Sequence, residues 1–190
     1  MKPEQKQDEQ ASTSEPYGTS TEAGTVRLER KLPGPIERVW EYLTDPEKRG
    51  KWFASGPMEL RPGGKIEFHH HNSQLTRHHE PTPERFKECE GMSSSGTVLK
   101  CDPPKLLSFS WEETSGEASE VTFELSESNK EVLMVLTHRR LRNRDEMVSV
   151  GAGWHVHVGL LSDTLSNREL RKFWSTYEQL EQEYDRLLPR

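Results

Sequence analysis

Histidine is the residue type in this chain best suited to chemistry, because its imidazole changes charge near neutral pH and binds metal ions as a neutral ligand. The segment HHHNSQLTRHH, residues 69–79, contains five of the eight histidines. If residues 66–71 form a strand, His69 and His71 share one face, whereas His70 points toward the core. The segment lacks HExxH spacing, and no cysteine or carboxylate stands nearby at a diagnostic spacing. We therefore expect no metal site.

The remaining histidines of interest follow predicted strand and helix patterns. His138 ends the apolar run VLMVLTH, and His155 and His157 stand two residues apart on a predicted helix, so they point away from each other. His157 follows Trp154 by three residues and should face a sheet, whereas we expect His155 at the helix edge or in solvent. A histidine beside an apolar pocket can orient a ligand or act as an acid or base. The alternative is a core histidine with one satisfied hydrogen bond.

Motifs for other chemistry are missing from the sequence. There is no nucleophile elbow and no phosphate-binding glycine loop, and Pro62-Gly63-Gly64 is typical of a turn. The two cysteines, Cys89 and Cys101, lack CxxC spacing, so we expect reduced thiols. The sequence therefore predicts no catalytic residue and no cofactor.

Composition excludes several classes of partner. The formal net charge is −6, and basic residues are interspersed with acidic ones, so nucleic acid is not an expected partner. No apolar run approaches the roughly 20 residues needed to span a bilayer. Met1 opens a stretch rich in Lys, Glu and Gln rather than a signal sequence. We expect a cytoplasmic protein without a membrane span.

Hydropathy patterns divide the chain into a polar tail and one domain. Residues 1–23 contain too few apolar side chains to offset the entropy of ordering them, so we expect a disordered tail and a single domain over 24–190. Period-two alternation from Val26 predicts the first strand. An amphipathic helix should begin at Ile36, and a short second helix should follow Asp45 and continue through Trp52.

The rest of the domain reads as a sheet followed by helices. Strand candidates separated by turn residues predict antiparallel hairpins, and Leu107, Phe109 and Trp111 give one strand an apolar face. A long amphipathic helix from Met147 to Leu165 should cover that face. A further helix, at about 168–188, should pack on the outside of the domain.

Several of these stretches resemble a known superfamily. They are TVRLERKLPGPIERVWEYLTDPEKRGKWF, MELRPGGKIEF, GTVLKCDPPKLLSFSWEE, EVTFEL and GAGWHVHVGLLSDTL. Together they are similar to the SRPBCC superfamily of START-like, helix-grip proteins, in the branch named for the activator of Hsp90 ATPase. The resemblance implies an α+β helix-grip fold, with a curved antiparallel sheet of about six or seven strands around a long C-terminal helix and two short helices after the first strand.

The resemblance also implies a cavity between the sheet and the long helix. The candidate cavity residues are Phe68, His70, Phe109, Trp111, Phe123, His138, Trp154, His157 and Leu161. Aromatic side chains there suit an apolar or amphiphilic small molecule, although the same side chains can collapse into a packed core. Residues 69–84 form an insertion relative to the family pattern, and either a lid over the cavity or a solvated loop fits it.

Three functions remain open at this point. The first is a non-enzymatic binding or carrier protein for a small molecule, because a lined cavity is expected without a reactive constellation. The second resembles the polyketide cyclases and dehydratases of the superfamily, with His157 or His138 as a general acid or base. The third is a domain that interacts with an Hsp90-type chaperone. A protein partner or a homodimer also stays open.

Overall fold

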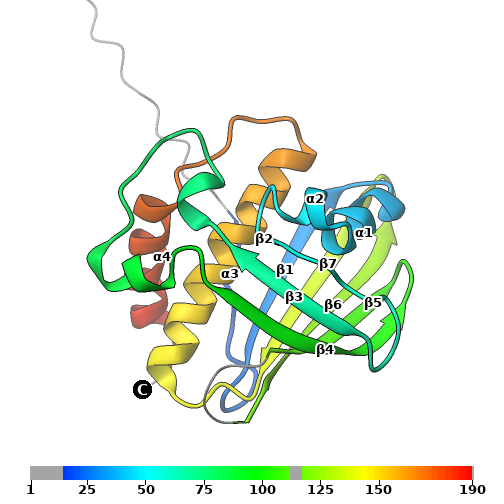
Figure 1. The fold of residues 1–190 in the computed structure, drawn as a ribbon, viewed down its shortest axis with the longest axis horizontal. Coiled ribbons are helices and arrows are strands. Elements are labelled where there is room, and N and C mark those ends of the chain that lie inside the picture. Colours follow the sequence, from blue (N-terminus) through cyan, green and yellow to red (C-terminus); the bar gives the residue numbers. More distant parts are fainter. Residues whose placement is uncertain (1–14, 112–116, 190) are drawn as a thin grey trace, which may run out of the picture.

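The computed structural model describes residues 15–111 and 117–189 as a curved sheet wrapped around a long helix (Figure 1). Seven antiparallel strands lie in the order β1-β7-β6-β5-β4-β3-β2, which confirms the α+β helix-grip fold. The strands are β1 (Val26–Pro33), β2 (Ala54–Ser55), β3 (Lys65–His70), β4 (Ser93–Asp102), β5 (Leu106–Trp111), β6 (Ser119–Ser128) and β7 (Glu131–Arg139). The helices are α1 (Ile36–Thr44), α2 (Pro46–Arg49), α3 (Arg144–Leu165) and α4 (Trp174–Leu187), with 3-10 helices η1 (Asn72–Gln74) and η2 (Glu84–Cys89). Within the described residues, no helix combines the length and apolarity needed to cross a bilayer.

The first strand and helix follow their sequence patterns. Val26, Leu28 and Leu32 of β1 are fully buried on the inner face of the sheet. Arg30 shares that face and is also buried, which is unusual for a charged side chain. In α1 the predicted apolar stripe is buried, including Trp40. Period-two and 3.6-residue patterns were therefore sufficient to place both elements.

The second helix is shorter than the sequence indicated. Asp45 caps its first turn, but α2 ends at Arg49 rather than continuing through Trp52. The buried guanidinium of Arg49 donates hydrogen bonds to the backbone carbonyls of Thr44 and Ala54 at 3.1 and 3.0 Å. These bonds fix the turn into β2, so the chain leaves the helix one turn early.

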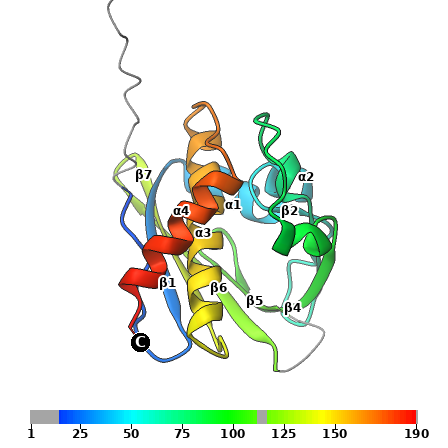
Figure 2. The same cartoon turned by 90° about the vertical axis from the view of Figure 1, so that its left-hand side faces the viewer.

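Helix α3 is covered on two sides, by the sheet and by α4 (Figure 2). Asn143 caps it by accepting a hydrogen bond from the backbone N–H of Glu146 at 2.9 Å. His155, expected at the helix edge or in solvent, is only 2% exposed. Its ring contacts Tyr17 and Tyr184, with ring centres 5.1 and 5.9 Å away. The prediction was wrong because it allowed α3 a single covered face.

Helix α4 packs on the outer side of α3 but begins at residue 174, six positions after the predicted start. The carboxylate of Glu80 accepts hydrogen bonds from the backbone N–H groups of Trp174 and Ser175 at 3.0 and 3.3 Å. These groups lie at the first turn of a helix, where N–H donors lack intrahelical partners. A residue far away in sequence thus sets the start of α4.

The N-terminal boundary of the domain lies earlier than residue 24. Residues 15–23 pack on the domain, whereas the part of the expected tail before residue 15 lies outside the described residues. The Glu15 carboxylate accepts a bidentate pair from Arg171 at 2.9 and 3.0 Å, and the backbone N–H of Gly18 donates to the Tyr184 hydroxyl at 2.7 Å. Thr19 pairs with Arg27 beside the edge strand β1. Specific polar contacts order this segment despite its low hydrophobicity.

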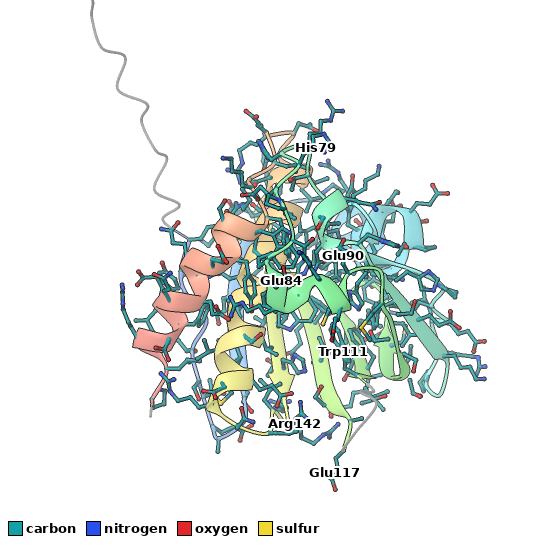
Figure 3. All side chains as sticks on the ribbon, turned by 60° about the vertical axis from the view of Figure 1, so that its left-hand side comes forward. His79, Glu84, Glu90, Trp111, Glu117 and Arg142 are labelled. Atoms are coloured by element: carbon teal, nitrogen blue, oxygen red, sulfur yellow. The ribbon has the colours of Figure 1, made fainter. Side chains whose placement is uncertain are left out.

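The insertion at residues 69–84 and the following helix η2 are docked rather than freely solvated. Phe86 stacks on Trp174 with ring centres 5.2 Å apart, and Arg85 forms a bidentate ion pair with Glu181 at 3.0 and 2.6 Å. The indole N–H of Trp174 also donates to the Ser73 hydroxyl at 3.1 Å. In Figure 3, His79 lies at the outer tip of this segment. Helix α4 therefore holds the insertion against the domain.

Candidate functional site

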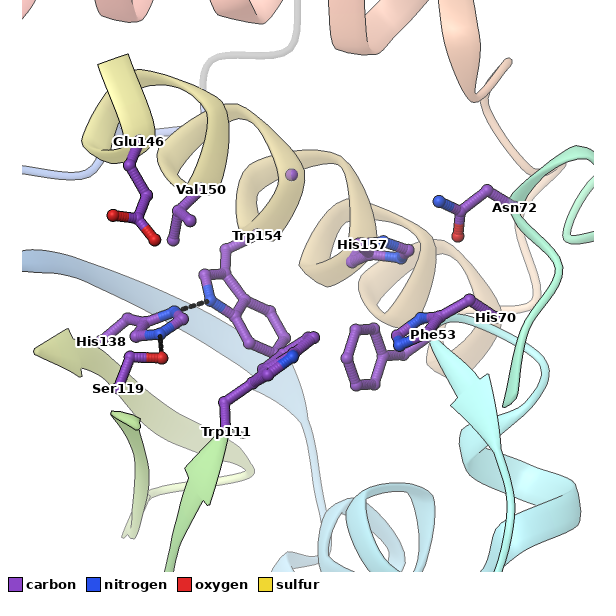
Figure 4. Close-up of a pocket in the computed structure, with 11 residues that line it drawn as sticks. Phe53, His70, Asn72, Trp111, Ser119, His138, Glu146, Val150, Trp154 and His157 are labelled. Atoms are coloured by element: carbon purple, nitrogen blue, oxygen red, sulfur yellow. Dashed lines mark hydrogen bonds between the residues drawn. The ribbon is translucent and has the colours of Figure 1, made fainter. Parts of the chain in front are cut away.

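A cavity of about 220 Å³ lies between the inner face of the sheet and α3 (Figure 4). Its walls come from β3, β5, β6 and β7, from α3, from η1 and from the turn before β2. The residues that line it are Phe53, His70, Asn72, Trp111, Ser119, His138, Glu146, Val150, Gly153, Trp154 and His157. Most of this wall is aromatic, with polar groups at both ends.

Trp111 forms the central surface of the cavity. Its ring is nearly parallel to those of His70 and His138, with ring centres 5.8 and 6.0 Å away. Trp154 meets Trp111 edge-on at 5.9 Å and an interplanar angle of 81°, and Phe53 lies 4.9 Å from Trp154. Flat aromatic faces and edges of this kind stabilise a planar apolar ligand through offset stacking and edge-to-face contacts.

One polar end of the cavity contains a fixed histidine tautomer. The indole N–H of Trp154 donates to Nδ1 of His138 at 3.0 Å, so this nitrogen carries the lone pair. The proton of neutral His138 is then on Nε2, which donates to the Ser119 hydroxyl at 2.8 Å. Burial lowers the pKa of His138 to about 4, against an opposing effect of Glu146. His138 therefore cannot accept the Ser119 proton, and Ser119 is not an activated nucleophile.

Glu146 supplies a carboxylate at the same end. Arg142 donates to it from its backbone N–H at 2.6 Å and from its guanidinium at 3.1 and 3.3 Å. Burial raises the pKa of the Glu146 carboxyl, but the hydrogen bonds and charge of Arg142 outweigh this and place it below the ordinary value. Glu146 is thus an anion that is already paired at neutral pH.

The other polar end presents hydrogen-bond acceptors. Nδ1 of His157 donates to the backbone carbonyl of Trp52 at 2.8 Å, which leaves the lone pair on Nε2. Burial, together with His70, lowers the pKa of His157 to about 4 against the opposing hydrogen bond, so the ring is neutral. Asn72 lies beside His157 and His70 in Figure 4, and its Oδ1 is buried without a hydrogen-bond partner.

His70 belongs to the same end and is also neutral. Its Nε2 lies 3.0 Å from the Ser94 hydroxyl. Burial, with the nearby charge of His69 and His71, lowers its pKa to about 4. Among the described residues, no group of three or more His, Cys, Asp or Glu side chains is arranged to hold a metal ion.

A family model described as activator of Hsp90 ATPase homolog 1-like protein matches residues 33–166, which include strands β2 to β7, the residues that line the cavity, and α3. The chain belongs to this family. A structural relative from Bordetella parapertussis, solved by NMR, is 42% identical to this chain, with 92% of each chain covered and a TM-score of 0.76.

Two more distant structures share the fold of this chain. CalU16 from Micromonospora echinospora is 23% identical over 86% of this chain and 87% of its own, with a TM-score of 0.64. The Aha1 dimer from Colwellia psychrerythraea is 18% identical over 74% of this chain and 95% of its own, with a TM-score of 0.57. A comparison with curated proteins finds no match.

The structure separates the candidate cavity residues into two groups. Those that line the cavity are His70, Trp111, His138, Trp154 and His157. The others, Phe68, Phe109, Phe123 and Leu161, are buried in the packed core around it and do not line it. The cavity thus occupies only part of the space between sheet and helix, and the rest is filled by side chains.

Sequence reasoning did not select several residues that line the cavity. Phe53 follows α2 in a turn without hydropathy periodicity, and Asn72 lies in the insertion. Gly153 is a third case, because glycine has no side chain whose hydropathy could indicate that it faces a cavity. A Cβ added there would meet no atom within 4 Å. The Trp52-Phe53 pair, two adjacent aromatics after a helix, was the signal available for Phe53.

Proposed function

We propose that this chain binds a planar apolar or amphiphilic small molecule in the cavity and acts as a binding or carrier protein. The observation that carries the proposal is a partly open cavity of about 220 Å³ between the sheet and α3, lined largely by aromatic rings. Concave sites with mostly aromatic or apolar walls and a few polar groups are typical of small-molecule binding.

The size of the cavity limits the ligand. An engineered apolar cavity of about 150 Å³ in another protein accepts benzene, whereas drug-sized ligands occupy about 300–1,000 Å³. At about 220 Å³, the cavity lies between these limits. A ligand of one or two aromatic rings fits this range, and the polar groups at both ends admit substituents.

Gly153 provides the test of this proposal. Naphthalene is the probe, and quenching of tryptophan fluorescence reports its binding, because Trp111 and Trp154 line the cavity. Gly153→Leu should fill the space and abolish binding without lowering the melting temperature, since an added side chain there begins in open space. Gly153→Ala, which adds one methyl group, is the matched control and should weaken binding less. Unchanged naphthalene affinity in Gly153→Leu would place the ligand elsewhere.

An enzyme is the second candidate, and one observation favours it. His157 presents a fixed lone pair to the cavity, oriented by the Trp52 carbonyl, as a positioned base would. His138 lacks this property, because its lone pair is occupied by the Trp154 indole. Conversion of a bound compound that is lost in His157→Gln while binding persists would support the enzyme. The family description mentions Hsp90, but no contact among the described residues identifies a surface for a chaperone, so we propose no chaperone partner.

A further inference from the structure

The end of the cavity near β3 contains two acceptors and no donor partner for either. Nε2 of His157 carries a lone pair, because Nδ1 is bound to a backbone carbonyl, which can only accept. Oδ1 of Asn72 is buried and has no hydrogen-bond partner. We propose that the cavity selects neutral ligands with a hydroxyl or phenol group that donates to Asn72 or His157, and that it rejects carboxylates. This inference rests on the proposed function and specifies its ligand.

The position of Asn72 is fixed by contacts outside the cavity. Its neighbour Ser73 accepts from the Trp174 indole at 3.1 Å and donates its backbone N–H to Glu90 at 3.1 Å. Helix η1 is therefore attached to α4 and to the residue that follows η2. A buried acceptor held in place without a partner destabilises the empty cavity, and a ligand donor placed against it removes that penalty.

The charges around the cavity disfavour an anionic ligand. None of the described residues that line it is lysine or arginine, and its charged group is the carboxylate of Glu146. The lining histidines, His70, His138 and His157, are neutral at pH 7 because burial depresses the pKa of each to about 4. A ligand carboxylate entering this space would lose its hydration without gaining a cation.

Naphthalene and three of its derivatives separate the effects of the aromatic ring, the hydrogen-bond donor and the negative charge on binding. Naphthalene has the ring alone, 2-naphthol adds a donor, 2-methoxynaphthalene keeps the oxygen without the donor, and 2-naphthoate carries the negative charge at pH 7. Dissociation constants are measured by tryptophan fluorescence and calorimetry. The wild-type chain should bind 2-naphthol about tenfold or more tightly than 2-methoxynaphthalene, the ratio that corresponds to one satisfied buried acceptor. It should bind 2-naphthoate more weakly than naphthalene.

Variants assign the preference to its residues. The affinity ratio of 2-naphthol to 2-methoxynaphthalene should fall toward one in Asn72→Leu, in His157→Phe, or in both, according to which acceptor the ligand hydroxyl uses. Gln74→Leu, in the same 3-10 helix but exposed and outside the cavity, should keep the wild-type ratio. Because His157→Phe also removes the bond to the Trp52 carbonyl, its melting temperature is measured beside its affinity. If it does not fold, His157→Asn replaces it, because the asparagine amide can still donate to that carbonyl but has no counterpart of Nε2.

The outcomes distinguish this inference from the proposed function. Binding of naphthalene and 2-methoxynaphthalene with no preference for 2-naphthol, or tightest binding of 2-naphthoate, would overturn the donor selection and leave the cavity as a binding site. A wild-type ratio retained in both Asn72→Leu and His157→Phe would place the donor elsewhere. No binding of any of the four compounds would sink the proposed function itself.

Discussion

Acid should destabilise this protein well above the pH at which carboxylates titrate. His138, His155 and His157 are all less than 8% exposed, and burial lowers their pKa values to about 4, 3 and 4. In an unfolded chain histidine has a pKa of about 6.5. Below that pH the unfolded state binds protons that the native state does not, so stability is complete above about pH 6.5 and is lost as the pH falls toward 4.

The size of this effect follows from the same pKa values. At pH 5, each of the three histidines contributes a loss of about 2 kcal/mol relative to pH 7, because one pH unit below the unfolded pKa corresponds to about 1.4 kcal/mol. The combined loss of about 6 kcal/mol is comparable to the whole stability of many domains, about 5–15 kcal/mol. The protein should therefore lose most of its stability between pH 6.5 and pH 4.

Urea denaturation at pH 7, 6 and 5, followed by circular dichroism, measures the free energy of unfolding. His138→Gln should reduce the difference between pH 7 and pH 5 by about 2 kcal/mol, the contribution of one buried histidine. His79→Gln, at an exposed position in the insertion, is the control and should leave that difference unchanged. Equal free energies of unfolding at pH 7 and pH 5, within about 1 kcal/mol, would refute the reasoning.

Two further predictions concern stability. Gly153→Ala should stabilise the protein by about 0.5–1 kcal/mol, because alanine has a higher helix propensity than glycine. Gly151→Ala in the same helix should destabilise it, because the new Cβ would come 2.9 Å from the Tyr184 ring. If thermal melts showed both melting temperatures changing in the same direction, the described packing would be wrong. Glu15→Gln should cost about 1–3 kcal/mol by weakening a partly buried ion pair with Arg171, and an unchanged midpoint in urea would mean that residues 15–23 do not stabilise the domain.

Local patterns in the sequence were sufficient for most of the fold. Trp40 was placed on the buried face of α1 by its spacing, and His157 was placed toward the sheet by its distance from Trp154 along the helix. These predictions depend only on periodicity within one element. His155 was misplaced because the residues that bury it, Tyr17 and Tyr184, lie in segments far away in the chain.

The candidate cavity could be predicted only in part for a related reason. Phe109 and Trp111 share one face of β5, so alternation cannot show that Phe109 packs in the core while Trp111 lines the cavity. That difference depends on where α3 crosses the sheet. Phe53 and Asn72 come from a turn and an insertion, whose positions are fixed by tertiary contacts rather than by local sequence.

The central claim is that a small aromatic molecule enters the cavity that Trp111 and Trp154 line. The most direct measurement is a titration of nitrogen-15-labelled protein with 2-naphthol, following the indole N–H signals of the five tryptophans by NMR, with assignments from Trp→Phe substitutions. The signals of Trp111 and Trp154 should shift saturably, while those of Trp40 and Trp174, which do not line the cavity, should stay in place. Saturation without movement of the Trp111 and Trp154 signals, or no change in any of the five, would contradict the claim.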